Sequence, residues 1–500
     1  MAQLTTKDLN TGSIPQSGVK LLNAITANKI WGETSLQYGF GTQSALTLDT
    51  EFAAMFKAIF GNGAKPDATF AFATLSERAY GMIDSVSQLD FSFTSNVNQV
   101  DFVLTSTDDR PDSTTEGFFQ FPGNAMHGAG NAWSIGAFNS ALSQMTATPE
   151  KGGGEYANWT VIHEIGHSLG LKHTHQEKTG IPPLPEVGQY MDNEMYSVMS
   201  YKGASDGVKY GHAVSMMALD VAALQGLYGK EAYAEGKSFY TLMDAKGGNL
   251  QLDEGDVMIG RAYYCIWDSG GEDTIQYSGS GKSSIINLND ATLNTAGISA
   301  DLKALFAQLK AVDLVSYFDK DLKAGIFDQW HHAGGFFSQV LDFSNKKLHA
   351  IDGGFSIAHG AVIENAVGGF GADFLIGNEQ DNMLIGVGGD DTLLGSSGRD
   401  ELVGGAGEDW LDGGFGNDAL TGGNGGDFFM FYAGGGTDTI IDFTHADYID
   451  VSRLSGIDTY NELKSRMSNV DGDLVIKVGT AQIVVDGFQI NDMQKGDFLF

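Results

Sequence analysis

Cysteine, basic residues and long apolar runs are scarce in this chain of 500 residues. The one cysteine, Cys265, rules out an intramolecular disulfide, so the chain is either cytosolic or exported by a route that does not rely on disulfides. Only 29 Lys and Arg accompany 63 Asp and Glu, a formal charge of −34. Such a polyanion repels a phosphate backbone, which argues against a nucleic-acid partner. No stretch approaches the roughly 20 apolar residues of a bilayer span, so we expect no membrane insertion.

Proline is rare as well, at 8 residues, whereas glycine reaches 68. Disordered and collagen-like chains are rich in both residues, so the composition argues against these two classes. Abundant glycine with abundant aspartate is typical of tight turns that carry carboxylates, as in calcium-binding repeats. The length predicts two or three domains. The first 18 residues contain no basic segment followed by an apolar one, so we expect no Sec-type signal peptide.

Seven consecutive nonapeptides run from Gly368 to Met430 without a slip in register. The first position is always Gly, the sixth is Asp in six repeats and Asn382 in the other, and the eighth is Leu in six repeats and Phe429 in the last. This is the pattern of calcium-binding parallel β-helices in RTX proteins. A flexible glycine-rich linker would show neither the strict period nor the apolar eighth position. The repeats are GGFGADFLI, GNEQDNMLI, GVGGDDTLL, GSSGRDELV, GGAGEDWLD, GGFGNDALT and GGNGGDFFM.

The spacing within these repeats has a physical reason. Glycines allow the positive φ of a tight turn, so backbone carbonyls and the Asp carboxylate converge as oxygen ligands, while the eighth side chain points inward. The 63 residues hold twelve acids and one base, Arg399, so the segment repels itself until cations neutralise it. The loops at 268–275 and 434–440 also combine glycines with acids, and they fit either an extra calcium loop or an ordinary turn. The predicted calcium ligands are Asp268, Asp273, Gly369, Gly371, Asp373, Asn382, Gly389, Asp391, Asp400, Gly405, Gly407, Asp409, Gly414, Gly416, Asp418 and Asp427.

Segments on both sides of the repeats have patterns of their own. Residues 299–318 carry apolar side chains at the spacing of an amphipathic helix, with Ser299 as a plausible N-cap. Between 439 and 500, apolar runs such as 474–478 and 482–485 predict strands that continue the repeat stack as a β-sandwich.

The most specific motif is His163-Glu-Ile-Gly-His167-Ser-Leu-Gly170-Leu-Lys-His173. On a helix, His163 and His167 lie four residues apart on one face and can reach one metal ion. Glu164 is offset from that face, where it can hold a water without binding the metal. Gly170 can adopt the left-handed conformation that ends the helix and turns His173 back as a third ligand.

Alternatives exist for the histidines. HExxH alone occurs by chance in long helices, but Gly170 and His173 at these spacings favour a metal site. His175 is either a substitute for His173 or a surface residue, and the spacing favours His173. His331 and His332 fit no partner pattern, so we expect a structural role for them.

The segment Ser197-Val-Met199-Ser-Tyr201 follows the histidine motif, and by itself it would be assigned to a core. HExxHxxGxxH followed by SxMSY, however, resembles the metzincins and, within them, the serralysin family of secreted bacterial proteases. The resemblance extends to Leu227-Tyr228-Gly229, the 268–275 loop, the entry to the repeats at 363–369, the repeats themselves and Asp497-Phe-Leu-Phe500, which is similar to the C-terminus of type I secretion substrates. Thr174 departs from the family, which commonly has Pro after the third histidine.

The resemblance implies an α+β metzincin-like zinc protease domain over residues 1–235, followed by an all-β parallel β-roll or β-sandwich calcium-binding domain over 236–500. Residues before Ile30 are a propeptide or an extension, 296–350 a helical insertion and 439–500 the secretion region. In the family, Met199 would form a floor beneath the histidines, and Tyr201 would be a zinc ligand that leaves the metal and stabilises the transition state. Gly117, Phe118 and Phe119 are the best candidates for the substrate-binding edge strand, although core packing explains these aromatic residues equally well.

These features predict a secreted, extracellular zinc endopeptidase of broad specificity, with one catalytic Zn²⁺ and several structural Ca²⁺ ions. Glu164 accepts a proton from the attacking water and passes it to the leaving amine, while Tyr201 and zinc hold the oxyanion. The repeats stay unfolded in the cytosol and fold outside, where calcium is near the range of about 10⁻⁴–10⁻³ M. The implied partners of this monomer are protein and peptide substrates, a type I exporter and a periplasmic proteinaceous inhibitor. The alternative is an RTX adhesin or surface-binding protein with a vestigial zinc site.

Overall fold

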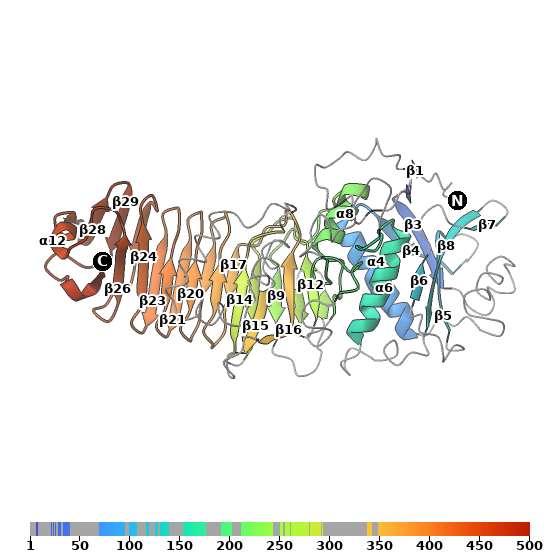
Figure 1. Cartoon of the computed structure of the whole chain (residues 1–500), viewed down its shortest axis with the longest axis horizontal. Helices are drawn as coiled ribbons and strands as arrows, with labels where there is room; N and C mark the ends of the chain where they lie inside the picture. The colour runs from blue at the N-terminus through green and yellow to red at the C-terminus, as the bar shows by residue number, and fades with distance from the viewer. Residues whose placement is uncertain are drawn as a thin grey trace.

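The structure is a computed structural model of the chain. It describes residues 7–8, 22, 24, 26, 29–31, 34–40, 70–95, 100–107, 117–119, 126–128, 131–139, 154–176, 192–202, 212–243, 251–253, 256–260, 262–279, 281–291, 293, 338–342 and 349–500. Figure 1 shows an elongated molecule in which a domain of helices and one twisted sheet is followed by a long β-roll that carries the C-terminus at its far end. The predicted order of an α+β domain and an all-β domain is therefore confirmed.

The first domain is built on a six-stranded sheet with the order β4-β3-β5-β8-β6, in which β7 also pairs with β8. Strands β4, β3, β5 and β8 are parallel, whereas β6 runs antiparallel to β8 at the edge of the sheet. A separate pair joins β1 and β2. The strands are β1 (Lys7–Asp8), β2 (Lys29–Ile30), β3 (Ser35–Phe40), β4 (Asp90–Phe93), β5 (Phe102–Thr107), β6 (Gly117–Phe119), β7 (Met126–Gly128) and β8 (Asn131–Asn139).

Two helices, α4 (Phe70–Val86) and α6 (Gly154–Ser168), pack side by side against this sheet (Figure 1). The buried residues of α4 recur every three or four positions, at Ala79, Ile83 and Val86, as expected for an amphipathic helix. Helix α6 is buried on several sides, because Val161, Ile162 and Ile165 are all at most 1% exposed. A third helix, α8 (Ala218–Tyr228), is almost wholly buried. Among the described residues, no helix is long and apolar enough to cross a membrane.

The C-terminal end of α6 has the geometry that Gly170 was expected to allow. Gly170 has φ 96°, its N–H donates to the carbonyl of His167, and the next N–H, of Leu171, donates to that of Gly166. This pair of hydrogen bonds is a Schellman motif, which closes a helix and reverses the chain. The hydroxyl of Tyr228, in the Leu-Tyr-Gly segment, donates to the carbonyl of Leu169 at 2.7 Å and holds this end in place.

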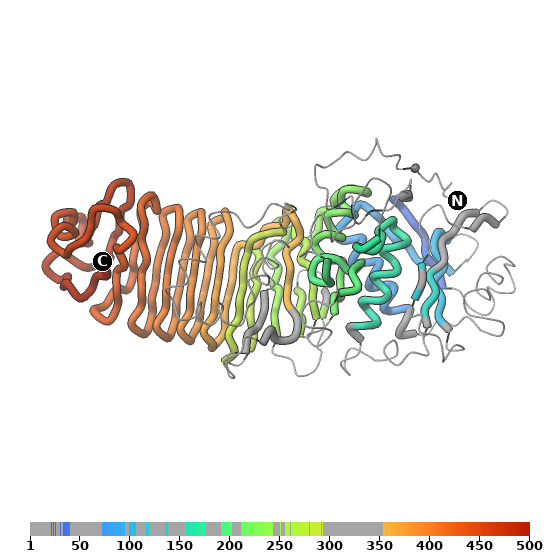
Figure 2. Tube along the Cα trace, viewed as in Figure 1, coloured from blue at the N-terminus to red at the C-terminus, as the bar shows by residue number. Residues whose placement is uncertain are grey.

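The second domain is a β-roll of two sheets that face each other, with 12 and 10 strands (Figure 2). The chain alternates between the sheets, so strands two apart in sequence pair in parallel. In order across the 12-stranded sheet the strands are β10 (Gln251–Asp253), β11 (Asp256–Ile259), β9 (Phe239–Leu242), β13 (Thr274–Tyr277), β17 (Asn365–Val367), β19 (Met383–Ile385), β21 (Glu401–Ala406), β23 (Ala419–Asn424), β25 (Thr437–Ile440), β29 (Ala481–Val485), β28 (Asp473–Val478) and β27 (Met467–Val470). Across the other they are β12 (Tyr263–Ile266), β16 (His349–Ile357), β15 (Ser338–Asp342), β14 (Ser283–Asn287), β18 (Phe374–Ile376), β20 (Thr392–Leu394), β22 (Trp410–Asp412), β24 (Phe428–Tyr432), β26 (Tyr448–Arg453) and β30 (Phe498–Leu499).

The eighth position of every repeat lies in the core between the two sheets. All seven side chains have 0% exposure: Leu375, Leu384, Leu393, Leu402, Leu411, Leu420 and Phe429. Successive side chains of a strand point to opposite faces of its sheet, so the middle residue of a three-residue strand points inward alone. One apolar residue per short strand is therefore enough to fill the narrow space between the sheets.

The roll continues beyond the seven repeats. After a two-residue insertion at 431–432, the sixth position recurs at Asp438 and Asp447, and the buried eighth at Ile440 and Ile449. Strands β25 and β26 accordingly pair with β23 and β24 at a spacing of 20 residues instead of 18. The stack predicted after residue 439 is present, and it ends in the antiparallel strands β27, β28 and β29.

The expected helical insertion over 296–350 needs a correction. Its described part, 338–342 and 349–350, consists of β15 and the start of β16. These two strands pair with each other antiparallel. They join the 10-stranded sheet between β14 and β12, because β14 offers a free edge to β15 and β12 offers one to β16. The amphipathic helix predicted for 299–318 lies outside the described residues, as do His331 and His332.

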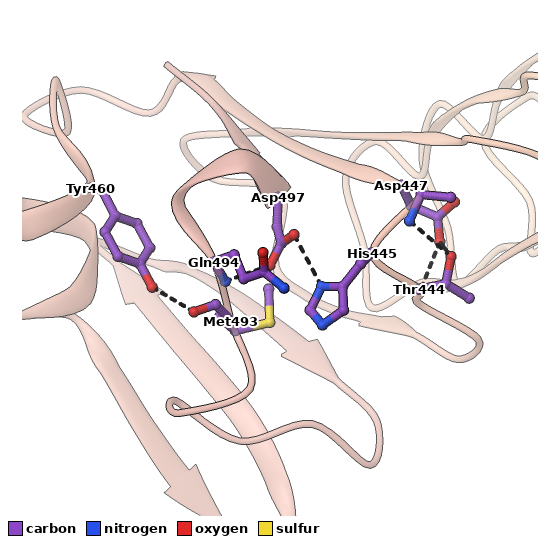
Figure 3. Close-up of polar contacts among 8 residues, drawn as sticks. Thr444, His445, Asp447, Tyr460, Met493, Gln494 and Asp497 are labelled. Atoms are coloured by element: carbon purple, nitrogen blue, oxygen red, sulfur yellow. Dashed lines mark hydrogen bonds and ion pairs between the residues drawn. The ribbon is translucent and has the colours of Figure 1, made fainter.

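The C-terminal residues close the roll as a cap (Figure 3). Helix α12 (Tyr460–Lys464) contributes the hydroxyl of Tyr460, which donates to the carbonyl of Met493 at 2.9 Å. A short 3₁₀ helix, η4 (Lys495–Asp497), precedes β30. The buried Asp497 lies 3.1 Å from Nδ1 of His445 and accepts a hydrogen bond from the backbone N–H of Gln494. The segment that resembles a secretion signal is thus folded into the last strand.

Backbone strain at one repeat turn gives a test of this fold. Val387 and Gly405 occupy the second position of two repeats, and both have positive φ, 84° and 117°. Such a conformation costs a β-branched residue of the order of 1–3 kcal/mol. We expect Val387→Gly to raise the free energy of unfolding of the roll by about 1 kcal/mol, measured by urea denaturation. Gly405→Ala should lower it, because the added Cβ would lie 2.4 Å from the carbonyl oxygen of Val387; equal effects of the two changes would contradict the assigned strain.

Candidate active site

Three histidines from two segments converge on one point. His163 and His167 project from α6, and His173 returns to them after the Schellman turn. Nε2 of His173 lies 3.0 Å from Nε2 of His167 and 3.2 Å from Nε2 of His163. Two nitrogens bound to the same tetrahedral Zn²⁺, each at 2.0–2.1 Å, are about 3.3 Å apart. Nε2 of His173 therefore lies at the spacing that zinc requires from both other Nε2 atoms, and all three lie within 4.8 Å of one another.

The other ring nitrogen of each histidine is occupied. Nδ1 of His163 lies 2.6 Å from the carbonyl oxygen of Val198, and Nδ1 of His167 lies 2.8 Å from that of Leu171. A carbonyl only accepts, so both Nδ1 atoms carry the proton and both Nε2 atoms keep a lone pair. Nδ1 of His173 lies 2.8 Å from the side-chain amide of Gln176.

Burial keeps these imidazoles neutral. It lowers the pKa of His163 well below the ordinary value, that of His167 to about 4 and that of His173 to about 3. Neutral imidazole is the form that binds a metal ion. The spacing, the tautomers of His163 and His167 and the neutral state of all three rings fit zinc, and the three residues that would hold it are those predicted from the sequence.

Met199 packs against α6, and Tyr201 contacts the histidines themselves. Met199 is fully buried, and its sulfur occupies the space that a side chain at Gly166 would need, at 2.8 Å from the missing Cβ. The hydroxyl of Tyr201 is 2.6 Å from Nε2 of His173, and its ring is stacked with that of His163 at 5.4 Å. Tyr201 is thus within reach of the same ion. His175 is exposed and stacked on His173, with ring centres 5.2 Å apart.

Glu164 lies partly buried next to the edge strand β6. A Cβ on Gly117 would lie 2.9 Å from Cγ of Glu164 and 3.3 Å from its Oε1, so glycine leaves room for the carboxylate. Phe119 is 4% exposed and packs edge-on against Phe102, so this aromatic residue belongs to the core. The side chain of Phe118 lies outside the described part of the structure.

Two buried aspartates were missed in the sequence. Asp220, on α8, has 0% exposure and accepts hydrogen bonds from the hydroxyl of Ser197 at 2.6 Å and the N–H of Val198 at 2.7 Å, the residue whose carbonyl meets His163. Asp192 accepts hydrogen bonds from the hydroxyl of Thr174, which follows His173, and from that of Ser200, which precedes Tyr201. A lone acid in the apolar run MALDVAAL was a signal for Asp220, because a buried charge needs partners. No comparable signal marked Asp192.

The turns of the roll contain two ladders of carboxylates. In the first ladder, the backbone N–H of each aspartate donates to Oδ1 of the aspartate one turn further on, at 2.7–3.0 Å; its members are Asp373, Asp391, Asp409, Asp427 and Asp447. The second ladder, along the other edge, continues through Asn382, Asp400, Asp418 and Asp438. It begins earlier, because the N–H of Asp273 donates to Glu364 at 2.8 Å. Glu364, Asp438 and Asp447 were absent from the predicted ligand set.

The second oxygen of most of these carboxylates has no hydrogen bond although it is buried. This holds for Oδ2 of Asp273, Asp391, Asp400, Asp409, Asp418 and Asp427. A Cβ at the first repeat position, as at Gly386, would lie 2.2 Å from Oδ2 of Asp391 and 2.5 Å from the carbonyl of Gly404. Side-chain and backbone oxygens from two turns gather in this way at five of the seven first glycines, Gly368, Gly377, Gly386, Gly395 and Gly404. Such a set of hard oxygen atoms fits Ca²⁺.

Four predicted members of the ligand set have other surroundings. The amide nitrogen of Asn382 donates to the carbonyl of Glu364 at 2.9 Å, and its oxygen accepts the N–H of Asn378 at 2.8 Å, so hydrogen bonds close this turn. Asp268 is fully buried and accepts the hydroxyl of Tyr240 at 2.6 Å. Of the predicted glycines, positive φ is found at Gly389, Gly405, Gly407, Gly414 and Gly416, but not at Gly369 or Gly371.

Fold and site together resemble those of the metzincin class of metallopeptidases. A family model described as Peptidase M10 serralysin C terminal matches residues 256–304 and 323–493, and one described as Metallo-peptidase family M12B Reprolysin-like matches residues 82–174, which include the three histidines. Serralysin G from Dickeya chrysanthemi is 29% identical over 292 residues, covering 55% of this chain and 46% of that protein. Serralysin C from the same organism is 31% identical over 270 residues (52% and 43%), and serralysin from Proteus mirabilis is 31% identical over 283 residues (54% and 45%).

Both parts of the chain are thus similar to serralysin-type metzincin metallopeptidases, in line with the resemblance that the motifs indicated. The chain spans less than half the length of these curated relatives. The first family model leaves residues 305–322 unmatched, within the segment that the sequence marked as an insertion.

The ladder carboxylates predict how stability depends on pH when no cation is bound. Burial raises the pKa of Asp391 from 3.8 to about 9, and of Asp400, Asp409 and Asp438 to about 7. The folded roll therefore holds more protons than the unfolded chain from about pH 4 to pH 9, and its free energy of unfolding falls as the pH rises. In a chelator, the roll should therefore keep more of its β signal in circular dichroism at pH 6.5 than at pH 9.

The zinc-site histidines, whose pKa values are lowered in the folded chain, destabilise it only as the pH falls through their ordinary pKa of about 6.5, so they oppose the carboxylate trend only at the lower end of this range. Asp391→Asn keeps the shape and cannot titrate, so the variant should show a weaker dependence, measured by circular dichroism. A β signal that grows from pH 6.5 to pH 9 would show that the carboxylates are not held in an unfavourable charged state.

Proposed function

We propose that the chain is a zinc-dependent endopeptidase that cleaves extracellular proteins with broad specificity. The observation that carries the proposal is the convergence of three neutral imidazole nitrogens at 3.0 and 3.2 Å, with the carboxylate of Glu164 and an edge strand beside them. A pure binding module, such as an adhesin, has no use for this arrangement.

The residues around the centre have distinct tasks in peptide hydrolysis. His163, His167 and His173 would hold the zinc ion, which polarises the scissile carbonyl and lowers the pKa of a bound water when present. Glu164 accepts the proton of the attacking water and passes it to the leaving amine. Tyr201, with its hydroxyl on the side of His173, donates a hydrogen bond to the oxyanion.

Strand β6 supplies the binding surface for substrate in this proposal. Among the described strands it is the last of its sheet and runs antiparallel to β8, and Gly117 lies directly against Glu164. A peptide that pairs with this edge places its backbone beside the general base. Main-chain pairing tolerates many side chains, which accounts for broad specificity.

The roll acts as a calcium-dependent folding unit in the same proposal. Its unpaired buried oxygens and raised pKa values oppose folding when no cation neutralises them. Low cytosolic calcium then keeps the region unfolded and suited to a type I exporter, and the higher extracellular concentration, near about 10⁻⁴–10⁻³ M, folds it outside the cell.

Removal of the general base tests the catalytic proposal. Glu164→Ala should keep one zinc per chain, because the three ligands are unchanged, and should lower casein hydrolysis by at least about 10²-fold. Zinc is measured by elemental analysis and hydrolysis by release of soluble peptides. Asp101→Asn, at a buried carboxylate that accepts the N–H of Gln37 at 2.7 Å, serves as the control for loss of a buried carboxylate. A fully active Glu164→Ala variant would refute the assignment.

Calcium addition tests the folding proposal. The full chain, freed of metal by a chelator and then supplied with zinc alone, should lack part of its β signal in circular dichroism. Calcium at about 10⁻³ M should restore this signal. Asp400→Asn and Asp409→Asn, one from each ladder, should each shift the midpoint to higher calcium. A spectrum that calcium leaves unchanged would contradict the proposal.

A further inference from the structure

Tyr201 and the third histidine are carried by two segments that are neither helix nor strand, 171–176 and 192–202. The side chain of Tyr201 is 58% exposed, so packing in the core does not determine its position. Its hydroxyl nevertheless lies 2.6 Å from Nε2 of His173, at the metal centre. The backbone on both sides of Tyr201 must therefore be held by other contacts.

The carboxylate of Asp192 makes these contacts. Its Oδ1 accepts hydrogen bonds from the hydroxyls of Thr174 and Ser200, the latter at 3.0 Å, and its Oδ2 lies 2.5 Å from Nζ of Lys202. Thr174 directly follows His173, and Ser200 and Lys202 flank Tyr201 on both sides. One side chain thus joins the loop of the third histidine to the loop of the tyrosine.

Burial makes the two hydroxyl contacts the more important ones. Asp192 is 4% exposed, and Thr174 and Ser200 have 0% exposure, so these hydrogen bonds are shielded from water. Lys202 is 62% exposed, where an ion pair contributes less. Two backbone hydrogen bonds run alongside, from Thr174 N–H to the carbonyl of Met199 at 3.3 Å and from Glu194 N–H to that of Lys202 at 2.8 Å.

We propose that Asp192 is a positioning residue that, through Thr174 and Ser200, holds the hydroxyl of Tyr201 at the metal centre. The inference rests on the proposed function, in which Tyr201 acts at that centre. It also gives a role to Thr174, at a position where the resemblance leads to an expectation of proline. Proline has no hydroxyl to donate, so the link from Asp192 to the third-histidine loop depends on the threonine of this chain.

Two conservative variants test the link in the full chain. Thr174→Val keeps the shape and removes one donor, and Asp192→Asn replaces one carboxylate oxygen with an amide that cannot accept from Lys202. Each should retain one zinc per chain and lower kcat on a peptide substrate on the order of tenfold, with KM changed less than twofold. The double variant should lose less than the product of the two, because both act on one link.

Copper(II) in place of zinc gives a readout that does not depend on activity. A tyrosine bound to copper(II) produces a charge-transfer absorption band, which Tyr201→Phe should abolish and both single variants should weaken. Asp497→Asn is the matched control: it alters a buried carboxylate in the C-terminal cap (Figure 3) and should leave both kcat and the band unchanged.

The outcomes separate this inference from the proposed function. An inactive wild-type chain whose copper band weakens in both variants would refute the peptidase and support the positioning role. An unchanged band and an unchanged kcat in Thr174→Val would overturn the inference, as would a wild-type copper protein without the band. If Asp192→Asn fails to fold or loses zinc, Thr174→Val alone decides.

Discussion

Buried carboxylates whose second oxygen has no protein partner are the constraint on which the long half of the molecule depends. Each ladder aspartate uses Oδ1 to accept a backbone N–H from the preceding turn, and this contact sets the spacing of the turns. Oδ2 is left buried and unpaired, as in Asp409. The cost of that oxygen is high in a medium of low dielectric. The same geometry that orders the roll therefore makes it dependent on a cation or on protons.

Two positions in the ladders show how the fold escapes this dependence. Both oxygens of Asp447 are satisfied, one by the N–H of Asp427 at 3.0 Å and the other by the N–H of Thr444 at 2.7 Å (Figure 3). The turn at Asn382 is closed by amide hydrogen bonds. The cap beyond Asp447 then rests on His445 and Asp497, so the last strand is anchored by ordinary side-chain contacts.

In the metal centre, by contrast with the roll, backbone atoms position the ligands. The carbonyls of Val198 and Leu171 fix the tautomers of His163 and His167, and Asp220 in turn holds the segment that contains Val198. The ligands are thus oriented by the Met turn and by the end of α6. Side chains far from the histidines in sequence, such as Asp220 and Tyr228, carry this arrangement through their contacts with these two segments.

The sequence by itself determined the repeats, the inward eighth position, the two-domain order and the three histidines with Glu164, because each depends on short-range periodicity or on the fixed geometry of one helix and its C-cap. It led to errors where pairing partners were distant: 338–342 and 349–350 form strands because neighbouring roll strands offer open edges. Glu364, Asp447 and Asp192 acquire their roles only in the tertiary structure. Their partners lie on other turns or loops, and no local pattern encodes a hydrogen bond between segments that folding alone brings together.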